Sequence, residues 1–173
     1  NVDTERVYLF GHSNGGFMVY RMACDHADII AAVASLAGAT FVDPADCIPS
    51  APVHTLQVHG TLDSLALYEG GVEIGGYPAV YPGAVETTEI WAAYNQCSAV
   101  ADLSRLSIDL DDHVSGCETT IASYTDGCDA GGSAELWTIV GGGHIPDLSA
   151  EFVPRVLDFF LSGGRGGVVP LPR

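Results

Sequence analysis

The stretch Val7-Tyr8-Leu9-Phe10-Gly11-His12-Ser13-Asn14-Gly15-Gly16 decides the fold of this chain, and Phe17-Met18-Val19-Tyr20-Arg21-Met22-Ala23 follows it. Its apolar beginning predicts a strand, and the segment after the glycines predicts a helix. A strand that ends in G-x-S-x-G and opens into a helix is the sequence form of a nucleophile elbow, a tight turn that exposes the serine hydroxyl. Because that turn is crowded, we expect glycine to be required at Gly11 and Gly15. A glycine-rich phosphate-binding turn is the alternative.

Two further apolar runs each lead to a residue that an activated serine requires. The run at 53–58 leads to Asp63, and the run at 136–140 leads to His144. Since the carboxyl ends of parallel strands meet at one edge of a sheet, we expect both side chains to lie beside Ser13. The chain order serine, aspartate, histidine is that of α/β-hydrolases. The pattern therefore predicts a catalytic triad with Ser13 as nucleophile, His144 as general base and Asp63 as the acid that orients the base.

Other acids and histidines compete for these roles. Asp43, Asp46 and Asp147 also lie in expected loops, but none directly follows the strand expected to carry the acid, and most loop aspartates are solvated turn or cap residues. We interpret His59 as shaping the acid loop by hydrogen bonding and His12 as packing beside the serine. No two histidines have the close helical spacing that metal ligation favours, so no metal site is expected.

The segments GHSNGG, HGTLD and GGGHIP, with Tyr81-Pro82-Gly83-Ala84 leading into the helix expected at 85–94, resemble the polyhydroxybutyrate depolymerase and feruloyl esterase family of α/β-hydrolases. The resemblance spans residues 7–161. It implies the same triad and a carboxylic-ester hydrolase that acts through an acyl-serine intermediate, without a cofactor, on short-chain, aryl or feruloyl, or polyester-type esters. Amidase and acyltransferase chemistry stay open, because a triad does not distinguish between acceptors.

The family pattern extends further towards the N terminus, whereas this sequence starts six residues before the strand that carries the serine. We therefore expect a truncated α/β-hydrolase, in which the backbone N–H of Asn14 supplies one oxyanion donor. The second donor would come from elsewhere in the chain or from a second chain. A weak or silent fragment that acts as a binding or assembly module is the alternative. The strand at 6–10 would be an apolar sheet edge, so we expect a homo-oligomer formed through it.

Alternating strand and helix signals predict one α/β domain over residues 1–162, with a roughly four-stranded parallel sheet and flanking helices, and a loose Gly/Pro-rich tail at 163–173. The expected strands are 6–10, 31–36, 54–59 and 135–140, with a further strand and turns within 115–132, and the expected helices are 14–23, 85–94 and 149–161. The segment 65–83 is expected to line or cover the site. Candidate substrate contacts are His12, Tyr68, Tyr77, Tyr81 and Ile145.

Charge and hydropathy narrow the range of partners. The 173 residues include 22 acidic and 6 basic side chains, which gives a formal net charge of −16. Such a charge repels phosphate backbones, so a nucleic-acid partner is not expected. No apolar run reaches the length of a membrane span, so no membrane partner is expected either.

Five cysteines in a chain of this size indicate an oxidising compartment, and we expect a secreted or periplasmic protein although the sequence shows no signal peptide. Cys24 and Cys47 flank the first strand–helix–strand unit and form a natural pair. The family resemblance implies a second pair, Cys97 with Cys128, which leaves Cys117 over. Buried free thiols are the alternative.

Overall fold

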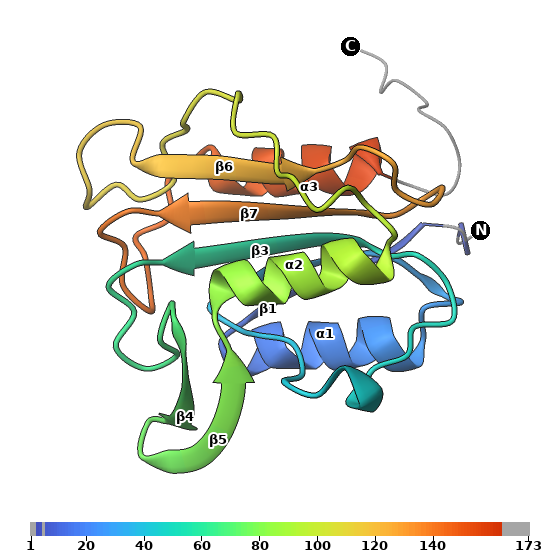
Figure 1. The fold of residues 1–173 in the computed structure, drawn as a ribbon. Helices are drawn as coiled ribbons and strands as arrows, with labels where there is room; N and C mark the ends of the chain where they lie inside the picture. Colours follow the sequence, from blue (N-terminus) through green and yellow to red (C-terminus); the bar gives the residue numbers. More distant parts are fainter. Residues whose placement is uncertain (1–2, 5, 164–173) are drawn as a thin grey trace.

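A computed structural model describes residues 3, 4 and 6–163 (Figure 1). The predicted tail therefore lies, from residue 164 onward, outside the described residues. The main sheet is mixed: four neighbouring strands are parallel, and one edge strand is antiparallel to the rest. Its spatial order is β1 (Val7–His12), β2 (Ile30–Leu36), β3 (His54–Gly60), β7 (Ser133–Ile139) and β6 (Thr119–Tyr124).

The α/β class and the parallel four-stranded core are confirmed, and the arrangement is compatible with an α/β-hydrolase-like fold. The strand expected within 115–132 is β6, which adds the antiparallel edge. Strand β2 is buried along its whole length because helices cover both faces of the sheet, as is typical of parallel strands.

Three helices form the outer layers (Figure 1). Helices α1 (Asn14–Asp25) and α2 (Ala84–Tyr94) pack on one face of the sheet, and α3 (Phe152–Ser162) packs on the other. The prediction that α3 begins at residue 149 is wrong. The backbone N–H of Ser149 donates to the carbonyl of Leu110, and this contact keeps the chain extended until just before the helix.

A two-stranded antiparallel hairpin occupies the segment that was expected to be a site-lining loop. Strands β4 (Gly70–Ile74) and β5 (Tyr77–Pro82) are joined by Gly75 and Gly76, both with positive φ (57° and 85°). A two-residue turn with positive φ at both positions matches the right-handed twist of its strands, which explains why two glycines stand there. The hairpin projects from the body of the domain beside the start of α2 (Figure 1).

Both expected disulfides are present. Cys24 at the end of α1 is bonded to Cys47, which follows the short 3-10 helix η1 (Pro44–Asp46), and Cys97 after α2 is bonded to Cys128. Cys117 is exposed and has no disulfide partner among the described residues. Two disulfides in one small domain indicate an oxidising compartment. None of the helices between residues 3 and 163 is both long and apolar enough to span a bilayer.

Candidate active site

Ser13 is the single residue between β1 and α1. Its φ of 55° lies in the left-handed region, which costs a non-glycine residue free energy and persists only where the surroundings hold it. Here the surroundings do so from both sides, because the Ser13 N–H donates to the carbonyl of Leu36 at 2.8 Å and the Ser13 carbonyl accepts from Phe17 at 3.1 Å. The turn therefore keeps the serine hydroxyl beyond the carboxyl end of the sheet.

The glycines around Ser13 serve different purposes. A Cβ at Gly11 would overlap the backbone of Gly15, so the first glycine is required by the close approach, as expected. The same expectation for Gly15 is wrong, because a Cβ there would meet no atom within 4 Å. Gly16 is the second crowded position, since its Cβ would lie 2.7 Å from Ser35 Oγ. The close approach therefore continues from the turn into the contact between α1 and the end of β2.

Ser13, His144 and Asp63 form one hydrogen-bonded chain. Ser13 Oγ lies 2.8 Å from His144 Nε2, and His144 Nδ1 lies 2.8 Å from Asp63 Oδ2. An ionised carboxylate can only accept, so His144 Nδ1 carries the proton and Nε2 accepts from the serine hydroxyl. The arrangement can remove a proton from Ser13 and stabilise the imidazolium that results.

Asp63 is fixed by four donors. Oδ1 accepts from the backbone N–H groups of Leu65 and Ala66, each at 2.9 Å, and Oδ2 faces His144 and, at 3.2 Å, the Nε2 of His59. Burial alone would raise the pKa of Asp63, but the hydrogen bonds from His59, His144 and the two backbone groups lower this pKa to about 2. The carboxylate is therefore ionised throughout the neutral range, although its side chain has no exposed surface.

The acid loop and the base loop are tied to each other. The N–H groups of Thr61 and Leu62 donate to carbonyls of Ile139 and Gly142, and the Gly141 N–H donates back to the Thr61 hydroxyl. These bonds form because the acid loop and the base loop follow the adjacent parallel strands β3 and β7. The pairing of two strands thus brings together residues 81 positions apart in the chain.

His12 and Asn14 flank the serine. His12 Nε2 lies 2.8 Å from the backbone carbonyl of His144, and the two rings are 5.1 Å apart, so His12 supports the base loop. Asn14 is the first residue of α1. The first N–H groups of a helix have no intrahelical acceptor and carry the positive end of the helix dipole, so the Asn14 N–H suits a developing oxyanion.

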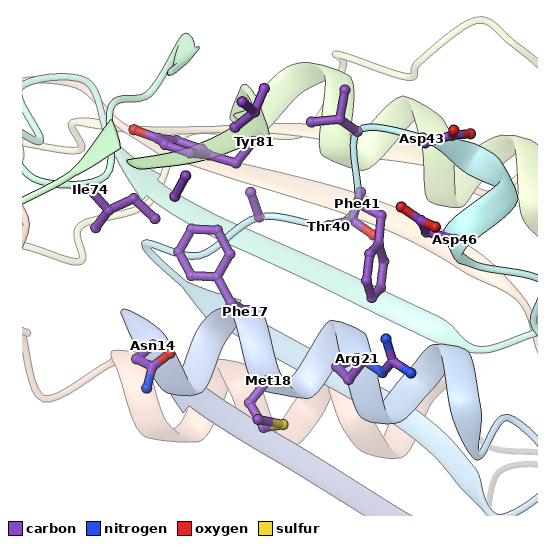
Figure 2. A pocket seen from close by; sticks show the side chains of 14 residues that line it. Asn14, Phe17, Met18, Arg21, Thr40, Phe41, Asp43, Asp46, Ile74 and Tyr81 are labelled. Carbon is purple, nitrogen blue, oxygen red and sulfur yellow. The ribbon is translucent and has the colours of Figure 1, made fainter. Parts of the chain in front are cut away.

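A cavity of about 650 Å³ is lined at one end by Asn14, the residue that follows Ser13 in the sequence, and runs along α1 (Figure 2). Ser13, Asp63 and His144 are not among its lining residues. Its other walls are the chain after β2, from Ala39 to Asp46, and the hairpin. Phe17 points from α1 toward Tyr81, with ring centres 5.7 Å apart, and the Arg21 guanidinium lies 5.5 Å from the centre of the Phe41 ring. The lining is mainly apolar, so the groove suits an uncharged ligand group.

Of the predicted substrate contacts, the structure brings Tyr81 into this groove, together with Asn14. Tyr68 instead bonds the Thr138 hydroxyl and packs edge-on against His59. Tyr77 at the hairpin tip and Ile145 next to His144 are each 79 % exposed, and neither lines the groove. His12 lies at the base loop.

Several groove residues were missed by sequence reasoning. The signal for one wall was the spacing of Asn14, Phe17, Met18 and Arg21, which repeats on one face of a helix. The other walls carry no periodic signal because they belong to irregular chain and to the hairpin. Of the competing aspartates, Asp43 and Asp46 line the groove, and the Asp43 carboxylate also caps η1. Asp147 pairs with His113 at the surface. Among the described residues, no three His, Cys, Asp or Glu side chains are grouped to hold a metal.

Comparison with known proteins gives partial matches to proteins named as esterases. No protein-family model matches the chain. It is 32 % identical over 148 residues to "Feruloyl esterase B" of Piromyces equi, and this alignment covers 83 % of this chain and 25 % of that protein. It is 41 % identical over 69 residues to "Putative esterase NocK" of Nocardia uniformis subsp. tsuyamanensis, and this alignment covers 40 % of this chain and 20 % of that protein. The alignments thus span a quarter and a fifth of these relatives. Together, the similarities place the chain in an esterase-like family.

Proposed function

We propose that this chain carries the active site of a serine carboxylic-ester hydrolase. The observation that carries the proposal is the unbroken chain of hydrogen bonds from Ser13 through His144 to Asp63. The strained backbone of Ser13 and the similarity to proteins named as esterases support it. We assign the roles of nucleophile, general base and orienting acid to Ser13, His144 and Asp63.

The reaction proceeds in two steps that use the same base. His144 takes the proton of Ser13 as Oγ attacks the ester carbonyl, and the Asn14 N–H stabilises the oxyanion. The imidazolium then gives its proton to the departing alcohol, which leaves an acyl-serine. Water, deprotonated by His144, attacks this acyl group, and the proton returns to Ser13 as the acid is released. Asp63 remains ionised and holds the imidazole throughout.

The groove along α1 supports a proposal for the substrate class. An apolar cavity of about 650 Å³ that begins at Asn14 can hold the apolar group of an ester whose carbonyl lies at Ser13. We propose esters of this kind as substrates: short-chain alkyl, aryl or feruloyl, and polyester-type esters. We also propose that the protein is secreted or periplasmic, which its two disulfides support.

Fluorophosphonate probes test the serine and the groove together, because such a probe labels a serine only when a base activates it. We expect Ser13 to be labelled, and we expect a probe with a bulky aryl group to react roughly 10-fold faster than a probe with a small alkyl group. The variant Ala79→Trp fills the groove from the hairpin and should remove this preference while the small probe still reacts. Labelling rates followed by mass spectrometry measure both effects.

The matched control is Val72→Trp, which adds the same side chain to an exposed position of the hairpin that does not line the groove. It should retain the preference. Equal rates for both probes in the unchanged protein would contradict the assignment of the groove and leave the triad standing. No labelling by either probe, in protein with a folded circular dichroism spectrum, would favour a silent binding or assembly module.

We further propose that the chain forms a homo-oligomer through the β1 edge. Strand β1 ends the sheet, and the apolar side chains of Phe10 on β1 and of Val153 and Leu157 on α3 are 47–61 % exposed. Tyr8 and Phe160 stack next to them, so β1 and α3 present one continuous apolar surface. Such an edge favours pairing with a second copy, whereas the net charge of −16 opposes close approach.

Light scattering should therefore give a mass that rises from monomer toward dimer as salt screens this repulsion. Leu157→Arg should lower the mass at high salt. Leu106→Arg, at an 88 % exposed position outside this surface, should leave it unchanged. A strictly monomeric particle at high salt and high protein concentration would refute the proposal.

A further inference from the structure

A series of buried, hydrogen-bonded polar side chains continues from Asp63 into the core, away from the reacting atoms. Gln57 and His59 stand two positions apart on β3 and therefore point to the same face of the strand. Both are buried, with 0 % and 1 % of their surface exposed. Polar groups at such depth require hydrogen-bond partners, and the partners here fix where each proton lies.

The amide of Gln57 has only one possible orientation. The atom 2.7 Å from the Gly38 carbonyl must be the nitrogen, because a carbonyl oxygen cannot donate. The Gln57 oxygen then accepts from the hydroxyl of Tyr20 at 2.9 Å. The second N–H of the same nitrogen faces His59 Nδ1 at 3.1 Å.

His59 therefore accepts at Nδ1 and carries its single ring proton on Nε2. That Nε2 lies 2.8 Å from the carbonyl oxygen of Ala66 and 3.2 Å from Asp63 Oδ2, and both of these atoms can only accept. The N–H of His59 is thus shared between the backbone of the acid loop and the carboxylate that faces His144. Every polar atom of Gln57 and His59 has a partner.

We propose that His59 is a positioning residue of this active site: as a neutral imidazole whose proton Gln57 holds on Nε2, it fixes the Asp63 carboxylate toward His144 and draws off part of its negative charge. The inference rests on the proposed hydrolase function. His59 does not touch the serine, and its effect passes through Asp63. Three further titratable groups face these hydrogen-bonded residues: Tyr20, which donates to Gln57, Tyr68, whose ring packs on His59, and His12, which contacts His144.

Two consequences follow from removing the His59 donor. The carboxylate loses one of its restraints, which misaligns the base and lowers kcat. Without the His59 donor, Asp63 Oδ2 keeps more of its negative charge, which stabilises the protonated form of His144. The acid limb of the pH profile of kcat/KM therefore moves to higher pH. A side chain that only fills space would change packing but would not move this limb.

The experiment compares two substitutions of His59, with p-nitrophenyl butyrate as substrate. His59→Leu removes the donor, and we expect kcat to fall roughly 10- to 100-fold with KM nearly unchanged and the acid limb about half a pH unit higher. His59→Gln places an amide N–H near the position of Nε2 and cannot become charged. It should restore both the rate and the acid limb to near the original values.

Thr138→Val is the matched control, since Thr138 stands opposite His59 on β7 and its hydroxyl bonds Tyr68. It should leave the acid limb in place. An equal loss in both His59 variants without a shift of the limb would show that His59 only packs.

Nitrogen-15 NMR of the unchanged protein gives a test that does not depend on how the variants fold. We expect a single ring proton of His59 on Nε2 at neutral pH, and a proton on Nδ1 or on both nitrogens would overturn the inference. This measurement also stands if the protein fails to hydrolyse esters, so failure of the proposed function and failure of the His59 assignment are distinguishable.

Discussion

Replacement of Ser13 by alanine is expected to lower kcat for p-nitrophenyl butyrate by roughly 10⁴-fold or more. In the proposed reaction Ser13 Oγ is the atom that forms the acyl intermediate, and its partner in the described structure is His144 Nε2 at 2.8 Å. Without Oγ, the imidazole has no nucleophile to activate, and the remaining oxyanion donor and groove contribute little to the rate. Spectrophotometric release of p-nitrophenol measures the loss.

Ser115→Ala is the control, because Ser115 is exposed and lies outside the groove and the triad. It should keep its activity. Thermal unfolding followed by circular dichroism checks that Ser13→Ala retains the fold. An unchanged kcat in a folded Ser13→Ala protein would contradict the assigned role of the serine and with it the proposed reaction.

Acidification from pH 6.5 to 4 is expected to lower the free energy of unfolding by roughly 3 kcal/mol through His54 alone. His54 is 5 % exposed, stacks on Phe159 with ring centres 3.8 Å apart, and bonds Ser133 Oγ and the Phe159 carbonyl. Burial lowers the pKa of His54 to about 4, and the bond to Phe159 only partly opposes this. Below pH 6.5 His54 therefore binds a proton in the unfolded chain but not in the folded chain. The free energy of unfolding falls until the pKa of His54 in the folded chain is reached.

Urea unfolding at several pH values measures this slope. His54→Gln keeps an N–H for the Phe159 carbonyl but cannot be protonated, so it should flatten the slope between pH 6.5 and 4. His26→Gln, at an exposed position, should leave the slope as it is. The loss that accompanies protonation of Asp63 falls below pH 4, because the pKa of that group is about 2. A slope that persists in His54→Gln would show that another group carries it.

The sequence was most informative where a residue follows a strand. Ser13, Asp63 and His144 each stand just beyond a predicted parallel strand, so the rules of parallel sheets were sufficient to predict that the three would meet. The hairpin was missed although Gly75 and Gly76 signal a two-residue turn, because the flanking strands are short and lie outside the main sheet.

The groove and the support of the triad could not be predicted in the same way. The groove walls come from a helix, irregular chain and a hairpin, and no local pattern states that these segments face one another. Gln57 did carry a signal, since an amide side chain between Leu56 and Val58 in a central strand must find buried partners. Its partners Tyr20 and Gly38 become visible only once α1 and the end of β2 are packed together.

The triad and the groove are held in place in different ways, because the Cys24–Cys47 bond stabilises the groove. Ser13, Asp63 and His144 follow the parallel strands β1, β3 and β7, and hydrogen bonds tie the Asp63 loop to the His144 loop. The wall of the groove from Ala39 to Asp46 is irregular chain, and the disulfide fastens its far end to the last turn of α1. Substitutions in the groove wall between these two cysteines can therefore change which ligands fit the groove. The disulfide keeps the wall in place, and the triad, which depends on the sheet, is not altered.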